Sequence, residues 1–354
     1  MKVVKKILKA LLVIVVVILV LFAALLIVLT VAEYKPEDQE QVAVEALNGD
    51  AKQLSSGDSI KIVSWNMGYG ALGNNADFFM DGGKMVYTAD EARVKENLSA
   101  MAGEIKAQNP DIVLLQEIDL DSSRSYHIDQ TAYFDGQGYN NMAFANNFKV
   151  AYFPFPIPPY GKIDSGIATY SKYPTTSATR IQLPCPFSWP VKTINLKRCL
   201  LVTRIPVEGG KELILINLHL EAYDDGEGKA AQAKMLMDIL NEESAKGNYI
   251  IAGGDFNQSF SNAKAPYKVY PEQWQPAFLD VSEYLDDWQF IMNNEVPTCR
   301  SLYMPLTGNE SSLQYYMIDG FILSKNITVD SYEIEDLGFK NSDHNPQVLE
   351  ITLN

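Results

Sequence analysis

The hydrophobic pattern divides the chain into one continuous apolar segment near the N-terminus and a long remainder in which apolar and polar positions alternate. The segment from Ala10 to Ala32 contains 23 residues without a charge. A helix of this length extends about 34 Å, which is enough to cross the hydrocarbon core of a bilayer. Residues 10–32 are therefore predicted to form a transmembrane helix.

The charges on either side of this segment predict its orientation. Four lysines lie within residues 1–9, whereas acidic residues dominate directly after the segment. By the positive-inside bias, we expect a single-pass cell-membrane protein with a cytoplasmic N-terminus and the bulk of the chain outside. The alternative is a signal peptide cleaved after Thr30-Val31-Ala32, although the apolar stretch exceeds the usual h-region of about 7–15 residues.

The remainder of the chain divides once more by composition. Residues 33–58 are acidic and polar, with few sizeable apolar side chains, and are interpreted as a stalk or linker. Residues 59–354 follow without a second linker, internal repeat or low-complexity tract, so we expect them to form one domain.

Within this domain, short apolar runs rich in β-branched residues predict strands, and helical spacing predicts two helices. A Thr88–Glu91 capping box opens the first helix, which ends at Asn109-Pro110, and the second spans about 229–245. Many strands and few helices predict an α+β fold in which two packed sheets are flanked by helices. The expected strands are 60–66, 111–117, 166–171, 200–205, 212–220, 249–253, 316–323 and 348–352.

Two segments combine prolines with aromatic residues. Residues 150–160 (VAYFPFPIPPY) contain four prolines, and residues 184–190 (PCPFSWP) are similar. Prolines at this density exclude a helix or a central strand. The segments are interpreted either as surface loops whose aromatic side chains pack onto the core, or as an apolar lip beside a site that touches lipid or substrate.

Charge and cysteine content narrow the function classes. The 354-residue chain has 29 basic and 44 acidic side chains, a formal charge of −15. Such a chain is not a binder that holds nucleic acid by basic patches alone, unless metal ions mediate the contact with phosphate. The three cysteines allow at most one internal disulfide, and spacing leaves open whether Cys185 pairs with Cys199.

Polar side chains terminate several of the apolar strands. By side-chain alternation, each ends an apolar stripe: Asn66 follows Ile62, and Glu117 follows Val113 and Leu115. Carboxylates and amides are seldom buried without a partner, so several of them at one rim suggest a shared role. The whole set comprises Asn66, Glu117, His219, Asp255, Asn257, Asp319, Asp343 and His344.

This set predicts oxygen ligands for Mg²⁺ or Mn²⁺ together with two of the three histidines of the chain. Zinc is poorly supported because neither cysteine nor histidine pairs have ligand spacing. A serine hydrolase and a P-loop enzyme are poorly supported as well, since neither a G-x-S-x-G nor a Walker motif is present.

Five motifs contain most of these residues and follow one another along the chain: SWN at 64–66, LLQEID at 114–119, INLHL at 216–220, GGDFN at 253–257 and SDHNP at 342–346. In this order they resemble the motifs of the endonuclease/exonuclease/phosphatase superfamily, in particular its deoxyribonuclease I-like and neutral sphingomyelinase-like branches. The resemblance covers about residues 60–352 and implies a four-layered α/β sandwich with its site at one end of the two sheets. One departure is Gly320, since relatives commonly carry a bulky residue after the aspartate.

The resemblance also implies a role for each candidate residue. Glu117 is expected to be the principal metal ligand, assisted by Asn66 and Asp343, for Mg²⁺ or Mn²⁺. The remaining expected roles are these: Asp255 orients or deprotonates the attacking water, Asn257 positions a phosphate oxygen, His344 contacts the phosphoryl oxygens and is oriented by Asp319, and His219 is a second histidine facing the phosphate.

The predicted function is thus a membrane-tethered, divalent-metal-dependent phosphodiester hydrolase, a nuclease or a phospholipid phosphodiesterase, that acts outside the cytoplasm. Its substrate is either nucleic acid or a phospholipid head group, and no specific protein partner is predicted. Two alternatives are an inactive binding domain on the same fold and a phosphomonoesterase of the inositol phosphatase type.

Overall fold

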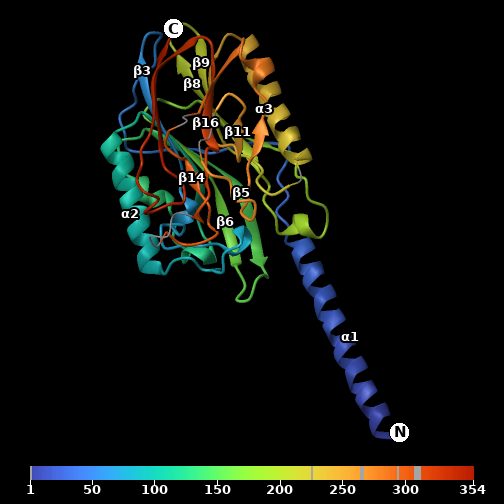
Figure 1. The fold of residues 1–354 in the computed structure, drawn as a ribbon. Helices are drawn as coiled ribbons and strands as arrows, with labels where there is room; N and C mark the ends of the chain where they lie inside the picture. Colours follow the sequence, from blue (N-terminus) through green and yellow to red (C-terminus); the bar gives the residue numbers. More distant parts are fainter. Residues whose placement is uncertain (1, 225, 264–266, 293–294, 307–311) are drawn as a thin grey trace.

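Two seven-stranded mixed sheets pack face to face in the computed structural model, which describes residues 2–224, 226–263, 267–292, 295–306 and 312–354 (Figure 1). The first sheet has the order β1 (Gln39–Val42), β7 (Ser177–Gln182), β8 (Cys199–Val207), β9 (Lys211–His219), β10 (Tyr249–Asp255), β16 (Asp319–Ser324), β13 (Trp288–Ile291). The second sheet has the order β17 (Ile327–Ile334), β18 (Gln347–Leu353), β3 (Ser59–Asn66), β4 (Ile112–Asp119), β6 (Gly161–Ser171), β5 (Asn141–Phe153), β2 (Val44–Ala46).

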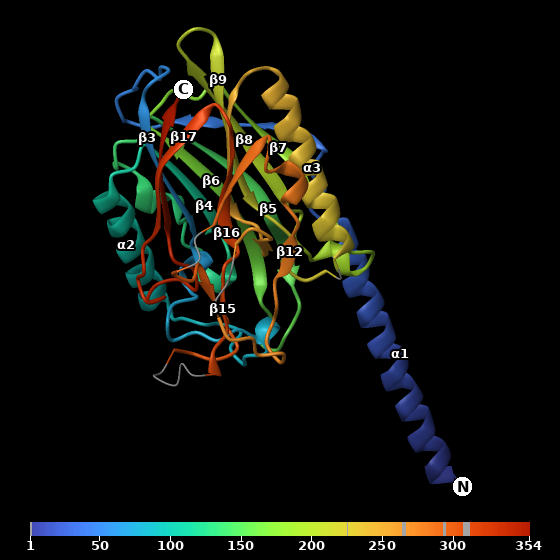
Figure 2. The same cartoon turned by 45° about the horizontal axis from the view of Figure 1, so that its top comes forward.

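Short pairs of strands lie outside these sheets. One pair is β11 (Gln258–Phe260) with β12 (Ala277–Leu279), and the other is β14 (Cys299–Arg300) with β15 (Tyr315–Tyr316). The second pair lies in the loops near the ends of the main sheets (Figure 2).

Helices cover the outer faces of both sheets and complete the four layers. The helix α2 (Glu91–Gln108) packs Leu98 and Ile105 against the outer face of β3 and β4. The helix α3 (Glu227–Ala245) packs Leu236 and Leu240 against β9 and β10. Both helices bury one apolar face, as their sequence spacing predicted. The predicted α+β sandwich is confirmed.

The layer between the sheets holds the alternate side chains of the central strands. Ile62 and Leu114 of the second sheet meet Leu215, Ile251 and Phe321 of the first in one buried cluster. Because successive side chains of a strand point to opposite faces, every second residue of these strands enters this layer. The same alternation carries polar side chains at the strand ends to the edge of the layer.

The segment interpreted as a stalk is partly built into the sheets. Strand β1 pairs antiparallel with β7, and β2 pairs with β5. Val42 and Val44 pack against the small apolar cluster that joins the edges of the two sheets. Two apolar side chains thus suffice to dock this short segment, and the interpretation of residues 39–46 as a linker was wrong. A soluble fragment that keeps both sheets intact has to begin before residue 39.

The N-terminal helix α1 (Lys2–Val31) projects away from the domain (Figures 1 and 2). It is long and apolar enough to span a membrane, and none of its most apolar window is buried against the domain. Within α1, only Leu29 is buried. The helix is therefore not a core helix of the globular domain.

Other local differences have simple physical reasons. The N-cap of α2 is Asp90, which accepts a hydrogen bond from the Arg93 N–H, whereas the Thr88 hydroxyl donates to the carbonyl of Ala71. The predicted Thr88 cap was therefore wrong by two residues. Strand β5 continues to Phe153 before the proline-rich turn begins. All three cysteines are free thiols.

The glycine after Asp319 has a packing reason. A Cβ atom at Gly320 would lie 2.6 Å from the carbonyl oxygen of Ile291 on the neighbouring strand β13. A larger residue is excluded unless β13 moves, because the clash is with backbone rather than with a flexible side chain. The departure from the superfamily pattern is therefore compatible with Asp319 in its predicted position.

We expect Gly320→Ala to lower the free energy of unfolding by about 2 kcal/mol, since β13 has to shift. The matched control is Gly103→Ala in α2, where a Cβ atom would meet nothing within 4 Å. That change should raise stability by about 0.5–1 kcal/mol through helix propensity. Denaturant unfolding of both variants measures the difference, and equal stability of the two would contradict the packing argument.

Candidate active site

Three neighbouring strands of the first sheet place acidic and imidazole groups side by side. His219 ends β9, Asp255 ends β10 and Asp319 begins β16. In the strand register Asp255 is the partner of both His219 and Asp319. All three residues occupy strand positions whose side chains point into the layer between the two sheets. They therefore converge at one edge of this layer.

The second sheet contributes Asn66 and Glu117 from the parallel strands β3 and β4. Asn66 follows the expected alternation. Glu117 does not, because Val113 and Leu115 face α2 rather than the other sheet. A β-bulge after Leu115 and a positive φ of 53° at Glu117 turn its carboxylate toward the site. Bulges commonly re-aim side chains in this way next to active sites.

The loop before β18 brings the last two residues to the same edge. The Ser342 hydroxyl donates to the carbonyl of Asn66, and the indole N–H of Trp65 donates to the carbonyl of His344. These two hydrogen bonds fix the loop onto the end of β3. Asp343 and His344 therefore face the strand ends of both sheets.

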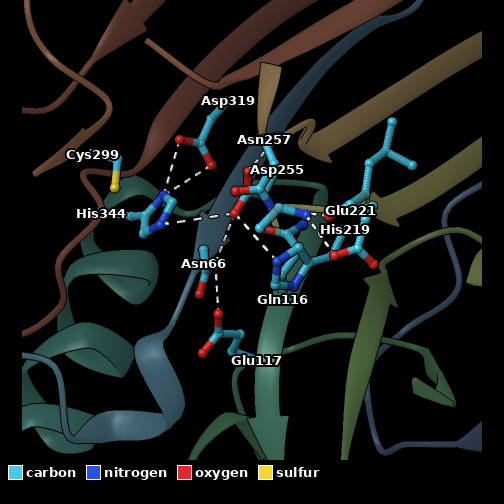
Figure 3. A network of polar contacts seen from close by, with 12 residues as sticks. Asn66, Gln116, Glu117, His219, Glu221, Asp255, Asn257, Cys299, Asp319 and His344 are labelled. Atoms are coloured by element: carbon cyan, nitrogen blue, oxygen red, sulfur yellow. Dashed lines mark hydrogen bonds and ion pairs between the residues drawn. The ribbon is translucent and has the colours of Figure 1, made fainter. Parts of the chain in front are cut away.

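A connected set of polar contacts joins the predicted residues (Figure 3). The amide nitrogen of Asn66 lies 3.3 Å from Glu117 Oε1 and 3.1 Å from Asp255 Oδ2. Asp255 Oδ2 lies 3.5 Å from His219 Nε2 and 3.8 Å from His344 Nε2. His344 Nδ1 lies 2.9 Å from Asp319 Oδ2. Residues from five separate motifs thus form one cluster.

Asn257 occupies the turn directly after β10. Its backbone N–H donates to Asp255 Oδ1, and its side-chain amide donates to the carbonyl of Leu220. Its φ of 51° belongs to the left-handed region, which asparagine tolerates better than most residues. The residue lines the same cavity as Asp255 and His344.

Burial and mutual repulsion strongly affect the carboxyl groups. Burial, reinforced by the charge of Asp319, raises the pKa of Asp255 to about 7. Burial also raises the pKa of Asp343 to about 6, with Glu117 adding to the rise and His344 opposing it. At both positions the charge of a neighbouring carboxyl group thus adds to the effect of burial.

The two histidines differ in charge. Burial opposes the protonated form of His344, but Asp319 outweighs it, so that the pKa of His344 lies well above its usual value. Burial, together with the charges of Arg198 and His344, keeps the pKa of His219 well below its usual value. At neutral pH the site thus contains one imidazolium and one neutral imidazole. His219 Nδ1 is buried without a hydrogen-bond partner among the described residues.

The donor set fits a hard divalent cation. Carboxylate oxygens of Asp255 and Asp319 lie within 4.8 Å of a nitrogen of His344, and Asp343 forms a similar group with His344 and the Cys299 sulfur. Glu117 and Asp343 both line the cavity, and the charge of Glu117 adds to the rise in the pKa of Asp343. Oxygen-rich sites with surplus negative charge suit Mg²⁺ or Mn²⁺. The amide oxygen of Asn66 accepts from the Gly68 N–H, and its nitrogen faces Glu117, so Asn66 positions that carboxylate here.

The cluster opens into a cavity of about 350 Å³. Glu117, His219, Asp255, Asp343 and His344 lie in its wall, and the rest of the wall is largely aromatic and aliphatic. Binding sites for small molecules commonly have a volume of this order.

Sequence reasoning missed several residues of the site. Asp81 lines the cavity and binds the Tyr223 hydroxyl at 3.0 Å; burial raises its pKa to about 7, and Asp343 and Glu117 add to the rise. Gln116 enters the inter-sheet layer and donates to Asn217 Oδ1 at 2.8 Å. Gln116 and Asn217 could have been identified from the sequence, because each is a polar residue inside an otherwise apolar strand. For Asp81, in an irregular loop, the sequence offered none.

Comparison with known proteins finds relatives of this fold. The profile described as "Endonuclease/Exonuclease/phosphatase family" matches residues 63–281. The endonuclease/exonuclease/phosphatase of Beutenbergia cavernae superposes with a TM-score of 0.56 at 18% identity, covering 84% of this chain and 72% of that one. The catalytic domain of human Nocturnin with bound sulfate gives 0.51 at 17% identity, covering 84% and 94%.

A third solved structure, D. rerio TDP2 complexed with a single-strand DNA product, gives a TM-score of 0.51 at 15% identity and covers 83% of this chain and 99% of that one. No curated protein sequence matches this chain significantly. Since the family profile spans more than half of the chain, the chain belongs to the endonuclease/exonuclease/phosphatase family. Members of this family are usually phosphoester hydrolases and generally use divalent metals.

The raised carboxyl pKa values predict how stability without metal depends on pH. Asp255 and Asp343 have an ordinary pKa of 3.8 when unfolded, so between about pH 4 and pH 7 the folded state binds more protons than the unfolded one. Their contribution to the free energy of unfolding is fully present below about pH 4 and is lost as the pH rises through about 6 to 7.

A bound divalent cation should remove this loss. Replacing EDTA by Mn²⁺ should therefore raise the Tm of the full chain. We expect this rise to be a few degrees larger at about pH 8 than at about pH 5. Differential scanning fluorimetry measures this rise, and Asp343→Asn should reduce it. A rise that is the same at both pH values would contradict the assignment of surplus negative charge.

Proposed function

We propose that this protein is a divalent-metal-dependent phosphodiester hydrolase that α1 tethers to a membrane. The proposal rests on one observation: three carboxyl groups and two histidines, one protonated and one neutral, line a single cavity. The carboxyl groups are those of Glu117, Asp255 and Asp343. Family membership supports the phosphoester hydrolase class. The four lysines in the first turns of α1 favour a cytoplasmic N-terminus and a catalytic domain on the other side.

Glu117 and Asp343 would hold the metal, with Asn66 fixing the Glu117 carboxylate. Bound Mg²⁺ or Mn²⁺ supplies Lewis-acid stabilisation of negative charge on phosphate oxygens. Hydrolysis adds one water across a P–O ester bond and gives a phosphomonoester and an alcohol. The remaining residues of the cluster handle the water and its protons.

Asp255 lies between the two imidazoles, and a pKa near 7 suits it to accept a proton from the attacking water at neutral pH. His344, held as an imidazolium by Asp319, donates hydrogen bonds to the phosphoryl oxygens and can return a proton to the leaving oxygen. His219, with its free Nδ1, and Asn257 line the cavity as neutral groups for the phosphate.

The alternatives are less well supported. An inactive binding domain would not need to keep the metal carboxylate, Asp255 and His344 together in a buried cluster that is electrostatically unfavourable without a cation. A polyphosphate monoesterase requires unpaired basic groups for its additional phosphates. The three arginines of the cavity wall are instead engaged with partners of the protein itself.

We expect the full chain in detergent to hydrolyse bis-p-nitrophenyl phosphate with Mg²⁺ or Mn²⁺ and to stop on addition of EDTA. Glu117→Gln and His344→Ala should each lower the turnover number by about 10²-fold or more, because each removes charge that stabilises the transition state. Release of p-nitrophenolate measures the rate.

Matched controls test whether the loss is specific to the site. His127 is exposed and pairs with Asp121, and Glu208 lies beyond β8 at the opposite end of the sheet. His127→Ala and Glu208→Gln should retain the wild-type rate. If Glu117→Gln or His344→Ala also did so while folded, the role assigned to that residue would be withdrawn.

A further inference from the structure

We propose that the cavity takes its phosphodiester from a lipid of the membrane that α1 enters, with the apolar part of the lipid against the aromatic wall. This inference rests on the proposed hydrolase function and names its substrate class. Four observations carry it: the lining of the cavity, the engagement of its arginines, the attachment of its wall to α1, and the exposed apolar residues next to its mouth.

The lining of the cavity is apolar on the side away from the catalytic cluster. Part of this lining comes from the β5–β6 hairpin and part from residues 187–196. Ile194 packs against the same small buried cluster of the hairpin as Phe148 and Phe153, so this cluster joins the two segments of the wall. The apolar lining residues of these segments are Phe148, Phe153, Tyr160, Phe187, Val191, Ile194 and Leu196.

The cationic groups of the cavity are not available for a polyanion. Arg124 makes two hydrogen bonds to Asp119, Arg198 binds Glu221, and Arg300 donates to backbone carbonyls; all three are buried. No lysine is found among the described residues that line the cavity. Nucleic acid binding draws on several Lys or Arg contacts to successive phosphates, which this wall does not offer. A single phosphodiester with an apolar body needs only the catalytic cluster.

The wall is attached to the end of α1. The indole N–H of Trp189 donates to the Thr30 hydroxyl at 3.0 Å, and Lys197 Nζ lies 2.9 Å from Glu33 Oε1. The side chains of Lys197 and Glu33 are both largely buried. Thr30 lies in the last turn of the apolar segment, where a transmembrane helix leaves the hydrocarbon core. Trp189 is thus held at the level of the lipid head groups, which is the preferred depth for tryptophan.

Both segments of the wall also carry exposed apolar side chains. We call Phe155, Ile157, Trp189 and Val191 the apolar rim; their exposed fractions are 55%, 92%, 53% and 50%. Val191 also lines the cavity, so the rim reaches the cavity at this residue. The β5–β6 hairpin, whose turn carries Phe155 and Ile157, extends toward the same side of the domain as α1 (Figure 1). Exposure of such apolar side chains to water is unfavourable. Their insertion into the head-group region of a membrane removes this apolar surface from water and is therefore favourable.

These features together give a route for the substrate. A lipid whose head group enters beside Val191 reaches the catalytic cluster while its apolar part stays along the rim and the aromatic wall. Water adds to phosphorus, one P–O ester bond breaks, and the departing alcohol oxygen takes the proton. Tethering by α1 keeps the mouth at the membrane surface, which raises the effective substrate concentration.

The test uses the full chain reconstituted into vesicles of phosphatidylcholine, phosphatidylethanolamine, phosphatidylglycerol and sphingomyelin in equal parts, with Mg²⁺. Loss of each parent lipid is followed by ³¹P NMR, which detects cleavage of either ester bond. Single-stranded DNA and bis-p-nitrophenyl phosphate are supplied to the same preparation. We expect at least one lipid to be consumed about tenfold or more faster than DNA phosphodiester bonds.

The variant Ile157→Glu places a charge on the rim without touching the catalytic cluster. It should slow lipid hydrolysis by about tenfold and leave the rate with bis-p-nitrophenyl phosphate unchanged. The matched control is Leu285→Glu, since Leu285 is 41% exposed and its carbonyl accepts from Lys325, next to the end of β16 opposite the site. Both rates of this control should equal those of the wild type.

The outcomes separate the two proposals. Hydrolysis of bis-p-nitrophenyl phosphate or DNA without any lipid loss would overturn the lipid assignment and leave the hydrolase function intact. Equal lipid rates for Ile157→Glu and the wild type would overturn the role of the rim. Absence of turnover on every substrate in the presence of Mg²⁺ and of Mn²⁺ would overturn the hydrolase function itself.

Discussion

Surplus negative charge in a buried place is the constraint on which the site depends. Strand register alone fixes His219, Asp255 and Asp319 side by side, and the end of the second sheet adds Asn66 and Glu117. Burial raises the pKa of Asp255 to about 7, and the neighbouring charge of Asp319 adds to the rise. Because several carboxyl groups are buried close together at this edge of the core, we expect a cation to bind there.

The same edge explains the division of labour between the histidines. His344 is held protonated because Asp319 stabilises its imidazolium, whereas His219 stays neutral because it is buried near Arg198. Two imidazoles on opposite sides of Asp255 therefore offer a charged donor and a neutral group within one cavity. General acid–base chemistry at a phosphorus centre needs this kind of asymmetry.

Side-chain alternation predicted most of the site, and local backbone irregularities decided the rest. Asn66, His219 and Asp255 lie where their strand parity placed them. Glu117 reaches the site only through a β-bulge and a positive φ, and neither can be recognised from alternating apolar positions.

The fold shows the same pattern. The central strands and both covering helices were predictable because their apolar spacing is regular. Strands β1 and β2 were not, since two valines in an acidic segment give almost no periodic signal, and their pairing depends on sheet edges formed elsewhere in the chain. Asp81 was missed for a related reason: only the folded chain brings its loop to the cavity.

Anomalous diffraction from a crystal of the protein soaked with Mn²⁺ shows whether the cavity binds a cation. We expect the strongest anomalous peak in the cavity, at about 2.0–2.3 Å from carboxylate oxygens of Glu117 and Asp343. A strongest peak outside the cavity, or a fully ordered cavity without any peak at saturating Mn²⁺, would contradict it.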